Sequence, residues 1–206
     1  MHPTSIAFSY AARVRYPAYG GRQIIPGAPS NLNPHAFVSE ELSDWLIPSD
    51  VPSLIELVQA YQKQNAPQRV RNALWNHESA FRNYFIENRW AMIVTGIESL
   101  VHIRDEKDPK TGKHAGSTRV FAQRGSQLAT LLGVAGLDEV ALRRSYAMRS
   151  EIVHGSGVPE VGADAKRLYE STESLLSTCI ARALLDDSFA AQFQSDKSVQ
   201  SAFPLS

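Results

Sequence analysis

One short segment of the sequence carries two side chains suited to phosphate chemistry. Arg149 and His154 stand five residues apart in the run Arg-Ser-Glu-Ile-Val-His, and a glycine follows at once. A guanidinium group can hold two phosphate oxygens with its planar fork, and imidazole exchanges a proton near neutral pH. The pair therefore predicts phosphate ester chemistry, with Arg149 as a fixed cation and His154 as general acid or base.

The spacing places these two residues on different sides of a predicted helix. Five helical steps turn by about 500°, so Arg149 and His154 lie about 140° apart around the axis and about 7.5 Å apart along it. They could border one groove from two sides, especially if a second copy of the chain supplies the facing wall. Ser150 lies four residues before His154 and shares its face.

Several other kinds of active site are missing from the sequence. It has no phosphate loop, no Gly-x-Gly-x-x-Gly after a predicted strand and no Gly-x-Ser-x-Gly elbow. Its histidines, at positions 2, 35, 77, 102, 114 and 154, show no metal-ligand spacing, and Cys179 is the only cysteine. We therefore expect no metal and no cofactor.

The segment resembles the signature of the HEPN superfamily, and in particular of its Apea-like branch, in which a helix ends in Arg-Ser-x-Ile-Val-His-Gly. Arg149 and His154 match the family's Arg-x4-His pair, and Ser150 stands where many HEPN nucleases carry Asn, Asp or His. The likeness extends over about residues 70–185. It includes an earlier helix with Gly-Ile-Glu-Ser-Leu at 96–100, a charged loop and an arginine-containing helix.

This resemblance implies a metal-independent endoribonuclease that leaves a 2′,3′-cyclic phosphate and a 5′-hydroxyl. Arg149 and His154 would be catalytic, with Ser150 in support, in a symmetric dimer whose two pairs line one cleft. HEPN proteins of this kind resemble toxins, phage-defence effectors and RNA-processing factors. Glu98, on an earlier predicted helix, could orient Arg149, although an ordinary exposed acid explains its presence almost as well.

The alternative is a non-catalytic interaction module that binds a regulatory protein partner or a nucleotide. Arg and His are common in the last turns of helices, because they complement the dipole and bind terminal carbonyls. The chain has 21 basic and 21 acidic residues, so no overall positive charge attracts RNA. Arg119, Arg124 and Arg144 are candidates for an RNA-binding rim, but arginines on helices are more often solvated or paired with acids.

Apolar spacing predicts an all-α protein, a bundle of antiparallel helices of the HEPN type. We expect an irregular N-terminal arm at 1–36, accessory helices at 37–66, the bundle at 67–187, and a short helix with a frayed tail at 188–206. The predicted helices cover about 39–45, 50–63, 67–84, 88–103, 117–132, 137–154, 162–185 and 188–193. Gly133 should end one of them in a left-handed conformation, and the charged segment 104–116 should be a solvated loop.

Trp45, Trp75 and Trp90 fall in apolar stripes and are predicted to be core residues, and so is Cys179. No segment resembles a signal peptide or reaches the roughly 20 apolar residues of a membrane span. We therefore expect a cytoplasmic protein that makes no membrane contact.

Overall fold

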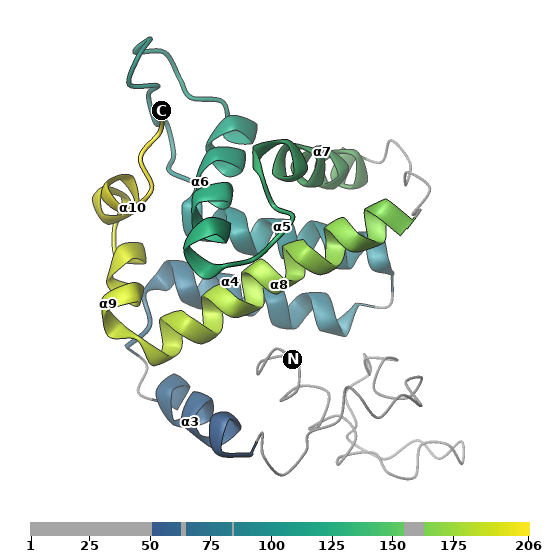
Figure 1. Cartoon of the computed structure of the whole chain (residues 1–206), viewed down its shortest axis with the longest axis vertical. Helices are drawn as coiled ribbons and strands as arrows, with labels where there is room; N and C mark the ends of the chain where they lie inside the picture. Colours follow the sequence, from purple (N-terminus) through teal and green to yellow (C-terminus); the bar gives the residue numbers. More distant parts are fainter. Residues whose placement is uncertain (1–50, 63–64, 84, 155–162) are drawn as a thin grey trace.

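The chain folds as an all-α helical bundle (Figure 1). The computed structural model describes residues 51–62, 65–83, 85–154 and 163–206. These residues form eight α-helices and one short 3-10 helix and contain no β-strand, which confirms the predicted fold class. The arm predicted at 1–36 and the helix predicted at 39–45 lie outside the described residues.

Helix α5 (Ile86–Val101) lies at the centre of the bundle. Its neighbours are α4 (Gln68–Arg82), α6 (Ser117–Leu132), α7 (Glu139–His154) and α8 (Ala163–Leu185). The apolar side chains of its buried face recur mostly at three- and four-residue intervals: Trp90, Ile93, Val94, Ile97, Leu100 and Val101. Because these side chains leave water together, the stripe that predicts the helix also determines which side of it faces the core.

Two glycines are required by the local geometry. At Gly96 of α5, an added Cβ atom would lie 2.6 Å from Leu176 Cδ2 of α8, so glycine allows these helices to approach closely. Gly133 follows α6 with φ at 68°, a left-handed conformation that residues with a side chain rarely adopt. The predicted end of α6 is confirmed.

The segment between α5 and α6 is a turn that is exposed over most of its length, as predicted, but two of its acids point inward. Glu106 is 8% exposed and Asp108 is 4% exposed. Asp108 accepts hydrogen bonds from the backbone amides of Lys110 (2.7 Å) and Thr111 (2.9 Å), and it pairs with Arg119. The Thr111 amide and the Arg119 side chain lower the pKa of Asp108 to about 2.

The C-terminal segment belongs to the core. Helix α9 (Asp187–Ala190), a 3-10 helix (Ala191–Phe193) and α10 (Asp196–Ala202) follow α8. Phe193 packs between two other buried rings, with centroid distances of 5.4 Å to Phe189 and 5.9 Å to Phe203. Aromatic rings at such distances attract one another and bury a large apolar area. The prediction of a frayed tail is therefore wrong.

Helix α3 (Val51–Gln62) is only partly covered. It contacts α8, and Leu57 is its buried residue. Other large apolar side chains of this helix are exposed, namely those of Val51, Ile55, Val58 and Tyr61. The apolar stripe thus predicted the helix correctly, but most of the stripe lies at the surface.

Of the predicted core residues that the structure describes, two are buried and one is exposed. Trp90 and Cys179 are buried as expected, whereas Trp75 is 69% exposed. Trp45 lies outside the described residues. Over the part of the chain that the structure describes, no helix has both the length and the apolar character needed to cross a membrane.

Candidate functional site

The candidate site lies at the C-terminal end of α7. The inner face of this helix buries Leu142, Ser145 and Met148, which recur every three residues. Arg149 follows Met148 and lies at the edge of this face, with 24% of its side chain exposed. His154 is the last residue of α7 that the structure describes, and it is exposed to solvent. The helix therefore places one half-buried cation and one accessible imidazole near the same end.

Arg149 is held by Glu98 of α5. Arg149 Nη2 lies 3.5 Å from Glu98 Oε2, and the Glu98 side chain is 19% exposed. The structure thus brings together the two residues for which the sequence suggested an orienting contact. Because both side chains are largely shielded from water, their attraction is screened less than that of a surface ion pair.

Tyr146 completes this group, and sequence reasoning did not single it out. Its hydroxyl donates to Glu98 Oε1 at 3.0 Å, and its ring centroid lies 5.7 Å from the guanidinium carbon of Arg149. Burial, followed by the negative charge of Glu98, raises the pKa of Tyr146 above its ordinary value, so the phenol stays protonated at neutral pH. The available signal was spacing, because Tyr146 precedes Arg149 by three residues and shares its side of the helix.

The structure does not join Arg149 to His154 within one chain. Arg149 contacts α5 through Glu98, whereas His154 stands in solvent at the end of α7. Ser150, the predicted supporting residue, is partly buried beside them. His154 is therefore accessible to a ligand or to a second chain.

The arginines predicted to form an RNA-binding rim lie in three different environments. Arg124 is fully buried and pairs with Glu106, so it cannot reach RNA in this fold and its predicted role is corrected. Arg119 pairs with Asp108 and donates to the backbone oxygen of Ser206 at 2.7 Å. Arg144 is exposed on α7 and is the one of the three without a described acidic partner.

A buried histidine of the bundle pairs with a carboxylate, and sequence reasoning also missed this contact. His77 of α4 has no exposed surface, and its Nε2 lies 3.1 Å from Glu173 Oε1 of α8. Its ring packs against Phe81 with centroids 4.9 Å apart. Because solvent does not reach His77, we interpret this pair as a structural link between α4 and α8. Among the residues that the structure describes, no three His, Cys, Asp or Glu side chains are grouped to hold a metal ion.

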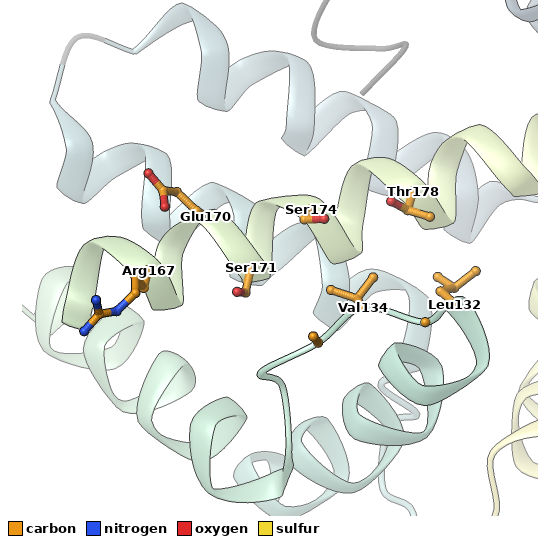
Figure 2. Close-up of a pocket in the computed structure, with 9 residues that line it drawn as sticks. Leu132, Val134, Arg167, Glu170, Ser171, Ser174 and Thr178 are labelled. Atoms are coloured by element: carbon orange, nitrogen blue, oxygen red, sulfur yellow. The ribbon is translucent and has the colours of Figure 1, made fainter. Parts of the chain in front are cut away.

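Two open grooves lie on other parts of the surface. Figure 2 shows the first, of about 520 Å³, between α8 and the segment that follows α6. Three hydroxyl side chains of α8 line it, those of Ser171, Ser174 and Thr178. The second groove, of about 410 Å³, lies where the C-terminal half of α6 meets the end of α10. Neither groove includes Arg149 or His154, so neither assigns a substrate to the candidate site.

The chain matches no family model, no curated protein and no solved structure. The resemblance to HEPN proteins therefore rests on the motif and on the order of the helices, and it stays a prediction.

Proposed function

We propose that this chain is a metal-independent endoribonuclease of the HEPN type that acts in the cytoplasm as a symmetric homodimer. The observation that carries the proposal is the setting of Arg149, a partly exposed guanidinium held by Glu98 and Tyr146 at the helix end where His154 is accessible. Cleavage of a phosphate diester requires such a fixed cation together with an acid–base group. A toxin or phage-defence effector is the biological setting that the resemblance suggests.

The proposed reaction is an internal transfer within RNA. The 2′-oxygen attacks the adjacent phosphorus while the bond from phosphorus to the 5′-oxygen breaks. One His154 takes the proton of the 2′-hydroxyl, and His154 of the partner subunit gives a proton to the departing 5′-oxygen. Arg149 stabilises the charge that develops on the phosphate oxygens. The products are a 2′,3′-cyclic phosphate and a 5′-hydroxyl.

The dimer is proposed because of the geometry of α7. Arg149 turns toward α5, and His154 lies about 7.5 Å further along the helix axis on another side. One chain therefore holds a phosphate from one side only. A two-fold axis close to the end of α7 would bring two copies of each residue to one cleft.

The test is incubation of the protein with a labelled mixed-sequence RNA in excess chelator, followed by analysis of the product ends. We expect cyclic phosphates from the wild type, and rates at least about 100-fold lower for His154→Ala and Arg149→Ala. Two exposed residues of the same types supply matched controls, His114→Ala and Arg143→Ala, which should cleave normally. Undiminished cleavage by the His154→Ala protein would refute the assignment.

The second candidate is a non-catalytic interaction module. It is favoured by the pairing of Arg149 with Glu98, which already balances the arginine charge, and by the zero net charge of the chain. In that case the end of α7 would bind a regulatory protein or a nucleotide. Calorimetry with a nucleotide panel would support this candidate if a nucleotide bound the wild type but not Arg149→Ala, while RNA remained intact.

A further inference from the structure

We propose that Tyr146 is a positioning residue, which holds Glu98 so that Glu98 in turn fixes the guanidinium of Arg149. The inference rests on the proposed function, because it concerns the preparation of Arg149 for a phosphate group. It assigns a role outside the Arg-x4-His motif. It can also be tested by a measurement that needs no RNA.

Glu98 presents one carboxylate oxygen to each of its two partners. Tyr146 Oη lies 3.0 Å from Oε1, and Arg149 Nη2 lies 3.5 Å from Oε2. A carboxylate with both oxygens engaged has a defined orientation, and this orientation determines where the guanidinium finds its counter-charge. Without the phenol hydrogen bond, the partly exposed carboxylate could rotate toward water and take Arg149 with it.

Tyr146 also contacts Arg149 directly. The distance of 5.7 Å from guanidinium carbon to ring centroid lies within the usual range for a cation over an aromatic ring. The tyrosine ring is itself anchored by Phe121 of α6, a fully buried residue whose ring centroid is 5.1 Å away. The position of Arg149 therefore depends on α5, α6 and α7 together.

Restraint of this kind matters because an arginine side chain has many rotamers. Ordering those rotamers only when substrate binds would weaken stabilisation of the transition state. Arg149 Nε is buried and has no hydrogen-bond partner among the described residues, so its Nη groups are the ones left to meet a phosphate. Tyr146 and Glu98 restrain these groups in the free protein.

The first test is the Tyr146→Phe variant. It keeps the aromatic ring and its contact with Phe121, and it removes only the hydroxyl that binds Glu98. We expect kcat to fall about tenfold, the effect of losing one hydrogen bond to a charged group, while KM stays within about twofold. Tyr61→Phe, at an exposed tyrosine of α3, should change neither constant. An unchanged kcat in Tyr146→Phe would overturn the proposal.

The second test asks whether Tyr146 acts through Glu98. In a Glu98→Ala background, adding Tyr146→Phe should lower kcat no further, because the group that the hydroxyl positions has already been removed. Independent effects that multiply would instead indicate a general structural role for Tyr146, and they would overturn the positioning role.

The third test does not depend on catalysis. The Nε–H signal of Arg149 can be identified in a ¹⁵N spectrum by its loss in Arg149→Lys, and its order parameter can then be measured. We expect a well-ordered signal in the wild type and a more mobile one in Tyr146→Phe. Equal order in both proteins would overturn the positioning role. If the wild type fails to cleave RNA, the proposed function fails, and this measurement still decides the role of Tyr146.

Discussion

The guanidinium of Arg124 lies fully buried against the carboxylate of Glu106, with its two Nη atoms each 2.6 Å from a carboxylate oxygen. Arg124 also donates to the backbone oxygens of Val101 (3.0 Å) and Phe203 (2.8 Å). One side chain of α6 thereby connects the end of α5, the turn after it and the C-terminal segment. A buried charge is tolerated here because its counter-charge and hydrogen-bond acceptors are all supplied by the protein.

Loss of this pair should destabilise the fold strongly. Arg124→Met leaves the buried Glu106 carboxylate without its counter-charge, which should lower the free energy of unfolding by about 3–5 kcal/mol. Urea denaturation followed by circular dichroism measures the change. The control is Arg143→Ala, which breaks an exposed pair with Glu139 and should cost less than about 1 kcal/mol. A similarly small loss for Arg124→Met would contradict the role assigned to the pair.

Asp108 should make the fold sensitive to acid. Its hydrogen bonds and its pairing with Arg119 lower its pKa from 3.8 to about 2. Because the folded pKa is the lower one, the ionised carboxylate stabilises the fold above the unfolded value, and this contribution is lost as the pH falls from 3.8 to about 2.

The measurement for Asp108 is the thermal midpoint as a function of pH. Asp108→Asn should lower the midpoint at neutral pH and flatten its decline in the acid range, because the titrating group has been removed. Asp105→Asn is the matched control, since Asp105 is exposed in the same turn with φ at 55°, a conformation that asparagine also tolerates. Identical pH profiles for wild type and Asp108→Asn would contradict the assignment.

Gly96→Ala should destabilise the bundle, although alanine favours helices. The new methyl group would meet Leu176 Cδ2 at 2.6 Å, and Leu176 is fully buried and cannot move into solvent. We expect a net loss of about 1–3 kcal/mol in the free energy of unfolding, the usual range for an overpacked core. Gly116→Ala, where an added Cβ has no neighbour within 4 Å, should have little effect. A stability equal to or above that of the wild type would contradict the expected net loss.

Spacing along the sequence located the helices better than it located the polar contacts. Helices α5, α6 and α7 begin and end within a few residues of the predicted bounds, because burying an apolar stripe is what orders a helix in a bundle. The burial of Arg124 escaped prediction, since no local pattern shows that Glu106, 18 residues earlier, folds back to pair with it. Trp75 was misassigned for a related reason: spacing predicts a helical face but not whether another element covers it.

The sequence likewise predicted one part of the candidate site and missed another. The motif predicted Arg149 and His154 near the end of a helix, and the structure describes both as residues of α7. The role of Tyr146 depends on Glu98, which belongs to another helix. The sequence alone does not show that α5 and α7 are in contact, so it did not predict this role.

Mixed dimers offer a decisive test of a shared cleft. If each cleft uses residues from both subunits, a subunit carrying Arg149→Ala and one carrying His154→Ala together retain one arginine and one histidine in the same cleft. Mixing the two inactive proteins under conditions of subunit exchange should then restore part of the cleavage activity, below that of the wild type. Each variant mixed with itself should stay inactive. The restored activity should stay well below that of the wild type, because the proposed reaction uses one His154 as base and the other as acid, and the mixed dimer holds only one of them. If the mixture is no more active than either variant alone while mass analysis shows that mixed dimers have formed, one arginine and one histidine do not support cleavage in a shared cleft, and this prediction fails.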